Sequence, residues 1–484
     1  MFLPYIHIKT KNDNYYVYDV FTRSFHLSNH INYELDKFCK ENNLSVIKLC
    51  KEEKEIFAQK EGISVLEIDK NIQLYKYLYS KKTSKGYKPL IYKPITYKDI
   101  WNSVAKVPHI IIEVTEKCNL ACKYCYYRDL YKNTEIRNKN INLDFCLRSL
   151  KTIIKLQQSK WNDSLKKEFC ISFYGGEALL NFVAIKRIVE YTQQFNSDTF
   201  KIVYRMTTNG VLLNKYIKFL INYNFYLSIS LDGDAYENSY RIFPDGKPSF
   251  PIIYKNLYYI KTNFPIYFKK NISFLSIQHN RNDAFGIYSF FRQFDKIPSI
   301  SSVSTESVNQ FYLKDFQEIS TLKPISWQEI QELQKENPEI FSKNYSSSII
   351  LEKYLSPLLD EIDLFNNDLK FNKVSILACF LFKIKLFLTV SGEIFICEKS
   401  SRAYPFGKVD EKGIHFDLKK INKYYLHLFT QMNKYCLTCY DILNCNSCFF
   451  SEPSKFSSIK KCKIDYDSFQ NRLTDLLNRN ESGQ

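Results

Sequence analysis

The chain of 484 residues lacks an apolar run long enough to cross a membrane. Its most apolar stretch, Val374 to Phe382, is followed by Lys383 and Lys385 and is far shorter than the roughly 20 residues of a transmembrane helix. The residues after Met1 form a mixed polar stretch, without the basic region and apolar block of a secretory signal. We therefore expect a cytoplasmic protein without a membrane partner.

Acidic residues are scarce relative to basic ones, 51 against 68, which gives a formal net charge of +17. Lysine recurs evenly along the chain instead of forming one block, and no nucleic-acid recognition motif accompanies the charge. We therefore expect no nucleic-acid partner. A solvated basic surface of this kind favours acidic peptides or acidic electron carriers.

Cysteine is absent between Cys170 and Cys379, and most of the 14 cysteines lie in two groups with short spacings. The first group is Cys118, Cys122 and Cys125, with the spacing C-x3-C-x2-C. Three thiolates this close can enclose only one compact centre, and three ligands to a four-iron cluster leave one iron open for a second molecule. A zinc knuckle is the alternative, but zinc sites usually close with a fourth nearby Cys or His, and none follows here.

The second group lies near the C-terminal end and surrounds Gly392. Its members are Cys379, Cys397, Cys436, Cys439, Cys445, Cys448 and Cys462. A zinc ribbon made by the four cysteines from Cys436 to Cys448 is an open alternative. Such clustering indicates metal or cluster chemistry in a reducing compartment instead of disulfides. The other cysteines are most simply buried small hydrophobic residues, namely Cys39, Cys50, Cys146 and Cys170.

Residues 107 to about 300 alternate between strand and helix patterns. Strands are predicted at His109–Val114, Phe169–Tyr174, Lys201–Thr207, Phe225–Ser230 and Asn271–Gln278. Helices are predicted between them at Phe145–Gln157, Ala184–Phe195 and Asn214–Asn222. This alternation predicts a parallel sheet. The polar and glycine-rich motifs all follow strands, which is where a barrel gathers its active-site loops.

The first cysteine group, in the run Thr-Glu-Lys-Cys-Asn-Leu-Ala-Cys-Lys-Tyr-Cys-Tyr-Tyr, resembles the signature of the radical S-adenosylmethionine (SAM) enzymes. The second group resembles the SPASM domain, an auxiliary-cluster module of radical SAM enzymes that modify peptides and proteins. One departure is that only Asn446 and Ser447 separate its fifth and sixth cysteines, where the usual pattern has three residues. The resemblance implies an α/β fold, a partial (β/α)6 TIM-like barrel followed by a SPASM iron–sulfur domain.

The resemblance also implies three [4Fe-4S] clusters, one that binds SAM and two auxiliary ones. The SAM cluster would be held by Cys118, Cys122 and Cys125. The nearer auxiliary cluster would be held by Cys379, Cys397 and Cys448. The distal auxiliary cluster would be held by Cys436, Cys439, Cys445 and Cys462.

The residues that the resemblance implies for binding SAM follow successive strands. They are Tyr124, Gly175, Gly176, Glu177, Asn209, Ser230 and Asp232. Glycines let the backbone approach a ligand closely, and a carboxylate after them can accept from the methionine ammonium. Asp232 is equally a turn-forming residue before Gly233. Glu398, next to Cys397, is the candidate catalytic base, or the fourth ligand of the nearer auxiliary cluster.

Five segments are predicted: a small α+β module (1–95), the radical SAM barrel (105–300), a bridging segment (301–370), the SPASM domain (371–470) and a tail (471–484). The module combines strands at Tyr15–Tyr18 and Phe25–Leu27, a helix at Tyr33–Asn42, a strand at Leu44–Leu49 and a helix at Lys51–Glu61. This order would fit a winged helix that captures a leader peptide by pairing it to a sheet edge. The alternative is an extension that only packs on the barrel.

The resemblance implies a radical SAM oxidoreductase-type peptide maturase. It would cleave SAM reductively and use the 5′-deoxyadenosyl radical to form a thioether or carbon–carbon crosslink in a ribosomally made precursor peptide. The implied partners are this precursor and an acidic electron donor such as a flavodoxin or ferredoxin.

Two other functions stay open. One is an anaerobic sulfatase maturase that forms formylglycine, although that family has Asp where this chain has Glu398 and usually lacks so long an N-terminal region. The other is an inactive peptide-binding partner of a maturase, which the intact first cysteine group disfavours.

Overall fold

The computed structural model describes residues 5–20, 24–80, 91–131, 138–163, 168–304, 308–322, 380–436, 439–440, 450 and 466–481. Several predictions fall outside these residues. They concern Cys379, Cys445, Cys448, Cys462 and most of the bridging segment.

A ten-stranded sheet forms the centre of the molecule, in the order β13-β12-β11-β10-β4-β5-β6-β7-β8-β9. Its parallel strands are β10 (Leu386–Leu388), β4 (His109–Thr115), β5 (Glu168–Gly175), β6 (Lys201–Thr208), β7 (Tyr226–Ser230), β8 (Ile272–Gln278) and β9 (Ser299–Ser302). The five strands predicted from the sequence are confirmed, and β9 and β10 extend the parallel set at either side.

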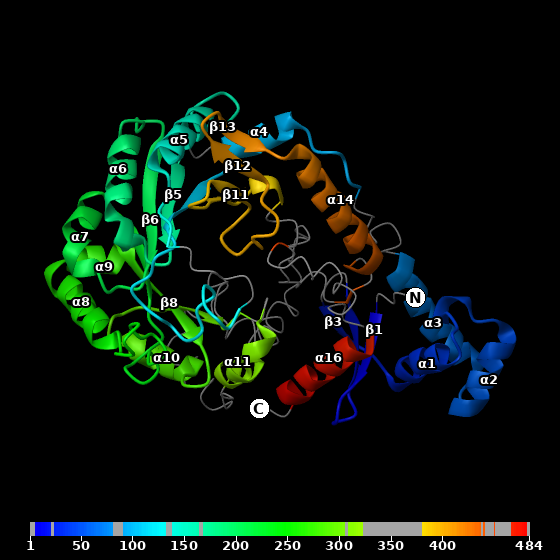
Figure 1. Ribbon diagram of the computed structural model, residues 1–484. Coiled ribbons are helices and arrows are strands. Elements are labelled where there is room, and N and C mark those ends of the chain that lie inside the picture. The colour runs from blue at the N-terminus through cyan, green and yellow to red at the C-terminus, as the bar shows by residue number, and fades with distance from the viewer. Residues whose placement is uncertain are drawn as a thin grey trace.

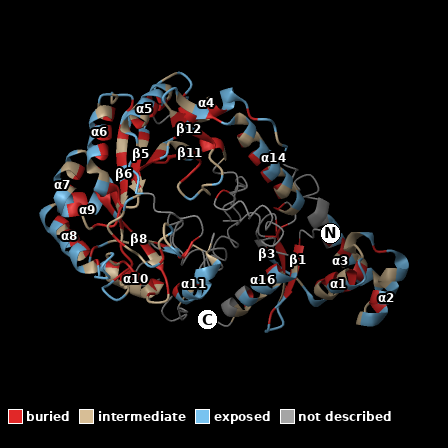
Figure 2. Cartoon of the chain, in the orientation of Figure 1, coloured by how far each residue is buried: buried red, intermediate tan, exposed pale blue. Residues whose placement is uncertain are grey.

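Helices cover the outer face of this curved sheet (Figure 1). They are α5 (Leu143–Gln157), α6 (Phe182–Gln193), α7 (Leu213–Asn222), α8 (Phe250–Asn263), α9 (Pro265–Asn271) and α10 (Ala284–Arg292), with the short η2 (Ala178–Asn181) after β5. Every second strand residue points outward, so that Ile110, Phe173 and Tyr204 join helix residues such as Ile153 and Ile185 in one core. Figure 2 shows the exposed residues on the outward sides of these helices. The parallel sheet predicted from the alternation and the partial barrel implied by the resemblance are both confirmed.

The inner face of the sheet carries the other strand residues and is more polar than the outer face. Because Ile110 and Ile112 belong to the outer core, their neighbours His109 and Glu113 must point inward. Arg205 on β6 is exposed on the same inner face. Polar side chains therefore lie on the inner side of the barrel.

The C-terminal part continues the same sheet. From β10 the chain runs antiparallel through β11 (Glu393–Phe395), β12 (Gly407–Asp410) and β13 (Gly413–Phe416). Two helices, α14 (Leu418–Tyr435) and α4 (Tyr97–Lys106), flank these strands together with the short η7 (Phe380–Phe382). Cys397 follows β11, and Cys436 and Cys439 follow α14; all three are buried. Gly392 lies at the β10–β11 turn with φ +79°, a conformation that favours glycine.

The N-terminal module is a three-stranded antiparallel sheet with helices beside it. It contains β1 (Tyr5–Lys9), β2 (Tyr15–Asp19), β3 (Ser24–Leu27), α1 (His30–Glu41), η1 (Val46–Lys48), α2 (Lys51–Glu61) and α3 (Val65–Ser80). The strand predicted at Leu44–Leu49 is wrong, since this segment forms the 3-10 turn η1. Its apolar residues pack between helices in a core with Leu35 and Phe57, so burial and not pairing determines its conformation.

The predicted tail is mostly helical. Helix α16 (Tyr466–Glu481) packs Phe469, Leu473 and Leu477 against Ile6 and Ile8 of β1. The N-terminal sheet and the C-terminal helix α16 therefore pack as one unit (Figure 1). Beyond β9 the chain adds η3 (Gln310–Tyr312) and α11 (Leu313–Ser320). None of the described helices has both the length and the apolar character needed to span a bilayer.

Candidate functional site

The loop of residues 116–131 follows β4 and carries the first cysteine group. Loops that follow β5, β6 and β7 contact it at the carboxyl end of the sheet. Gly176 N–H donates to Thr115 O over 3.0 Å, and Glu177 N–H donates to Lys117 O over 2.8 Å. The prediction that the motifs meet at one end of the barrel is confirmed, because parallel strands bring their carboxyl ends to the same edge.

Backbone hydrogen bonds hold this loop to the segment after β7. Ala121 N–H donates to Ile242 O over 2.6 Å, and Lys123 N–H donates to Tyr240 O over 3.0 Å. Within the loop, Arg128 Nη2 donates to Leu120 O over 3.1 Å. The stretch that carries the cysteines thus has a defined path although it is neither helix nor strand.

The three thiols of the loop are close enough to influence one another. Burial raises the pKa of Cys118 to about 11 and that of Cys122 to about 12, and it also raises the pKa of Cys125. The positive charges of the neighbouring Arg128 and Arg241 lower the pKa of these thiols, but by less than burial raises it. Metal binding must therefore displace protons from these thiols.

Within the described part of the chain, no three Cys, His, Asp or Glu side chains converge on the position of a single metal ion. An iron–sulfur cluster is larger, because each cysteine ligates a different iron atom. Three thiols spread along one loop, next to guanidinium groups that balance negative charge, fit that kind of group.

Two glycines allow the loop after β5 to lie directly against the cysteine loop. A Cβ on Gly175 would meet Thr115 O at 2.1 Å, and one on Gly176 would meet Lys117 O at 2.4 Å. Neither backbone oxygen can move without breaking the loop contacts. The described structure therefore uses both glycines for packing against the cysteine loop, and their predicted contact with SAM stays a prediction.

Glu177 follows β5 and Asn209 follows β6, and a hydrogen bond connects the two loops. The buried Glu177 carboxylate accepts from Leu179 N–H (3.1 Å), Thr208 Oγ1 (2.8 Å) and Asn209 N–H (2.7 Å). Asn209 Nδ2 donates to Asn119 Oδ1 over 2.8 Å and lies 3.9 Å from Cys118 Sγ. These side chains hold the cysteine loop in place, and their predicted roles toward SAM stay predictions.

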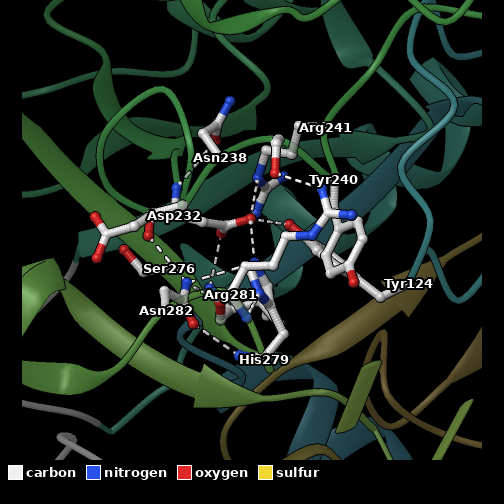
Figure 3. Close-up of polar contacts among 12 residues, drawn as sticks. Tyr124, Asp232, Asn238, Tyr240, Arg241, Ser276, His279, Arg281 and Asn282 are labelled. Carbon is white, nitrogen blue, oxygen red and sulfur yellow. Dashed lines mark hydrogen bonds and ion pairs between the residues drawn. The ribbon is translucent and has the colours of Figure 1, made fainter. Parts of the chain in front are cut away.

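Asp232, after β7, is the centre of a buried polar cluster (Figure 3). Its carboxylate accepts from Arg241 Nε at 2.9 Å and Nη2 at 2.8 Å, and from Ile277 N–H at 2.9 Å. Tyr124 donates its hydroxyl to the same carboxylate. His279 Nε2 lies 3.8 Å from Asp232 Oδ2. Asp232 is 0% exposed and its carboxylate is engaged by these donors, and its predicted contact with SAM stays a prediction.

The electrostatics of this cluster favour a charged pair. Burial alone would raise the pKa of Asp232, but Arg241 and His279 outweigh it and hold the pKa at about 2. Tyr124 is 8% exposed, with the His279 ring stacked on it at 5.6 Å and the Arg241 guanidinium 5.4 Å from its centroid. Ser230, by contrast, is half-buried on the inner face at the end of β7.

Glu398 lies on the inner side near Cys397. Lys385 Nζ donates to both of its carboxylate oxygens, at 2.9 and 3.0 Å. His109 Nε2 lies 2.5 Å from Ser172 Oγ on the neighbouring strand. Burial first, and then Lys385, lower the pKa of His109 to about 4, so this imidazole is neutral near pH 7. A paired carboxylate and a neutral imidazole thus face the interior of the barrel.

Several residues of the site are not identified by the sequence reasoning. Arg241 and His279 follow β7 and β8 without a motif that distinguishes them from surface residues. Arg402 and Glu113 form an ion pair 289 positions apart in the chain. A charged residue inside an apolar strand pattern, as in the case of Glu113, was the one available signal, since such a group is rarely buried without a partner.

The sequence model of the Radical SAM superfamily matches residues 112–284. A radical SAM cyclopropyl synthase, TigE, of Paramaledivibacter caminithermalis is 30% identical over 33% of this chain and 34% of its own. A cysteine-type anaerobic sulfatase-maturating enzyme of Clostridium novyi is 29% identical over 38% of this chain and 48% of its own. An uncharacterized protein of Methanocaldococcus jannaschii is 33% identical over 37% of this chain and 60% of its own.

In each of these cases the match spans less than two thirds of the relative. Among solved structures, anSMEcpe with bound AdoMet shares 18% identity and a TM-score of 0.46, over 76% of this chain and 99% of that one. Streptococcus suis SuiB shares 12% identity and a TM-score of 0.45, over 96% of this chain and 98% of that one. The matched region contains β4 to β8 and the cysteine loop. Residues 112–284 thus match a radical SAM domain, and the cysteine loop lies within the matched region.

Proposed function

We propose that this protein is a radical SAM enzyme that modifies a ribosomally made precursor peptide by forming a thioether or carbon–carbon crosslink. The observation that carries the proposal is the cysteine loop after β4, held by the glycine loop after β5 within a matched radical SAM domain. The superfamily implies one [4Fe-4S] cluster and SAM. When bound, this group supplies the carbon radical that takes hydrogen from an unactivated position of the substrate.

The residues of this chain would hold and shield the reacting groups. Cys118, Cys122 and Cys125 would ligate three irons and leave one open. Ser230, half-buried at the end of β7, would bind a ribose or carboxylate through its hydroxyl. Asp232 fixes the Arg241 guanidinium beside the loop with two hydrogen bonds.

Auxiliary clusters extend the proposal to the C-terminal part. Cys397, Cys436 and Cys439 are buried and would be joined by Cys379, Cys445, Cys448 and Cys462, which lie outside the described residues. Glu398 would act as base toward the substrate or as the fourth ligand of the nearer cluster. Since Lys385 holds both oxygens of Glu398, substrate or cluster binding would have to displace this ammonium.

The N-terminal module would capture the leader of the precursor. Helix α16 blocks one edge of its sheet: His7 N–H donates to Tyr466 Oη over 3.3 Å, Gln470 donates to His7 O, and Lys11 N–H donates to Asn478 Oδ1 over 2.7 Å. The opposite edge is β3, where Leu27 is 83% exposed. An extended peptide can add to an open edge of this kind.

The first test concerns the cofactor and uses anaerobically reconstituted protein with a strong reductant. We expect about twelve irons per chain and release of 5′-deoxyadenosine from SAM. Replacing Cys118, Cys122 and Cys125 together by Ala should remove about a third of the iron and abolish 5′-deoxyadenosine. Cys50→Ala, at an exposed cysteine outside both groups, is the matched control. A triple variant that still cleaves SAM would refute the assignment.

The second test concerns leader capture. Deleting residues 1–95 would expose the apolar side of α16, so a point substitution on β3 is sharper. Leu27→Asp should weaken binding of the precursor and leave SAM cleavage without peptide unchanged. Ile56→Asp, at another exposed apolar residue of the module, is the control. Equal dissociation constants for Leu27→Asp and the parent protein would favour the packing role of the module.

An anaerobic sulfatase maturase is the second candidate function, and the similarity to the Clostridium novyi enzyme supports it equally. Mass spectrometry of the product separates the two. A crosslink in the precursor supports the first function, whereas formylglycine in a sulfatase peptide supports the second. A protein that binds peptide but releases no 5′-deoxyadenosine would be an inactive partner. Electron delivery by a flavodoxin or ferredoxin, and a cytoplasmic location, are further parts of the proposal.

A further inference from the structure

The Glu113 side chain is a buried carboxylate on the inner face of β4. It is 2% exposed, and burial raises its pKa while Arg402 lowers it. Its two oxygens accept from three donors: Oε1 from Tyr127 Oη at 2.9 Å and Arg402 Nη2 at 3.2 Å, and Oε2 from Val390 N–H at 3.2 Å. Nothing in the function proposed above uses this carboxylate.

The three donors come from segments that are far apart in sequence. Tyr127 lies in the cysteine loop, two residues after Cys125. Arg402 lies in the segment that follows Cys397, and Val390 lies in the turn between β10 and β11. Arg402 Nη2 is also 3.2 Å from Tyr127 Oη, so the contact between the two loops is direct as well as through Glu113.

The guanidinium of Arg402 is held in place by aromatic rings. Its central carbon lies 4.6 Å from the centroid of Phe387 and 5.3 Å from that of Phe395, and both rings are buried. Its Nη1 is buried as well and has no hydrogen-bond partner among the residues that the structure describes. Two rings and a carboxylate contact the guanidinium and restrict its movement, so Arg402 and Glu113 hold each other in place.

Backbone pairing does not reach this point. Strands β4 and β10 pair over three residues, and the last pair is Ile112 with Leu388. Glu113 is the next residue of β4, which continues to Thr115 beside β5, whereas β10 ends at Leu388. The side-chain contacts of Glu113 thus continue the connection between barrel and C-terminal part beyond the end of the sheet hydrogen bonds.

We propose that Glu113 is a positioning residue that holds the cysteine loop and the segment after Cys397 at a fixed separation. The inference rests on the proposed function, in which these two segments each carry ligands of an iron–sulfur cluster. A fixed separation would keep the substrate between SAM and the nearer auxiliary cluster within reach of both. The donors Tyr127 and Arg402 act through Glu113 and need not touch the substrate.

Hydrogen exchange on the full chain without clusters tests the mechanical part. The amides of Arg128 and Tyr131 in one loop, and of Ser400 and Ser401 in the other segment, all have backbone acceptors. Glu113→Ala should speed exchange in both segments about tenfold, the factor that corresponds to one lost charged hydrogen bond. Arg402→Met should likewise speed amide exchange in the cysteine loop. Tyr127→Phe should speed amide exchange in the segment after Cys397.

Two further variants control this measurement. Glu113→Gln keeps an acceptor oxygen and should restore most of the protection that Glu113→Ala loses. Asp36→Ala removes another buried carboxylate, in the N-terminal module, and should alter neither segment. Exchange that changes only in the segment that contains the substitution would overturn the proposal.

Spectroscopy of the reconstituted protein tests the functional part. The magnetic interaction between the reduced SAM and auxiliary clusters should become weaker or more heterogeneous in Glu113→Ala and Arg402→Met at unchanged iron content. An unchanged interaction in both variants would also overturn the proposal. Absence of any auxiliary cluster in the parent protein would instead contradict the proposed function, and hydrogen exchange would still decide the role of Glu113.

Discussion

Substitution of Asp232 is the sharpest test of how the site is held. Asp232→Ala leaves the Arg241 guanidinium, whose side chain is 9% exposed, without its carboxylate. Breaking one partner of a buried ion pair costs about 3–5 kcal/mol, because the remaining charge stays buried and unpaired. Tyr124 and the backbone N–H of Ile277 also lose their acceptor. We therefore expect Asp232→Ala to lower the free energy of unfolding by about 4 kcal/mol.

Two companion variants separate charge from shape. Asp232→Asn keeps an acceptor oxygen but loses the charge. A fall of the pKa from 3.8 to about 2 corresponds to about 2 kcal/mol at 1.36 kcal/mol per unit, which is the expected loss for this variant. Combining Asp232→Ala with Arg241→Met removes the unpaired charge, so the double variant should be more stable than Asp232→Ala alone.

Urea unfolding of the protein without clusters, followed by circular dichroism, measures these differences. The pKa of Asp232 is lower in the folded state, so its contribution is present above pH 3.8 and is lost as the pH falls through about 2. The difference between parent protein and Asp232→Asn should therefore shrink below pH 3.8. A loss under about 1 kcal/mol for Asp232→Ala, or a double variant less stable than Asp232→Ala, would refute the reasoning.

Three further predictions follow from the contacts of the site. Gly176→Ala places a Cβ 2.4 Å from Lys117 O and should destabilise the cysteine loop by about 1–3 kcal/mol, seen as lower iron incorporation, while Gly246→Ala, where nothing lies within 4 Å, should retain its iron. His109 has a lowered pKa of about 4, so folding stability should fall between pH 6.5 and 4, and His109→Gln should flatten this fall in urea titrations. Lys385→Met frees both oxygens of Glu398 and should change the rate of product formation without changing SAM cleavage in the absence of peptide, whereas an unchanged rate would count against Glu398 as base.

The chemistry of the cysteine loop is readable from the sequence because it is local. Cys118, Cys122 and Cys125 lie within one loop, so their spacing restricts what they can bind whatever surrounds them. The strands from His109 to Gln278 are equally local, since buried parallel strands are nearly continuous apolar runs. Both the cysteine loop and the strands are therefore predicted from residues that are close together in the chain.

Other parts of the fold depend on partners that the local pattern does not reveal. The apolar residues from Leu44 to Leu49 have a strand-like composition, yet they form a 3-10 turn because helices cover them and none of the described strands pairs with them. The predicted tail is a helix whose apolar residues are covered by β1, more than 450 positions away. The spacing of Phe469, Leu473 and Leu477 is typical of a helix, but nothing in the sequence indicates that β1 covers these residues.

The sequence by itself determined the match to a radical SAM domain, the parallel sheet and the loop of three cysteines, because each of these is specified by residues close together in the chain. Only the tertiary structure decided what Asp232 and Glu113 do. One binds Arg241 inside the barrel, and the other joins Tyr127 to Arg402 across 275 positions. A buried carboxylate takes its role from the donors that folding brings to it, and no spacing in the sequence specifies those donors.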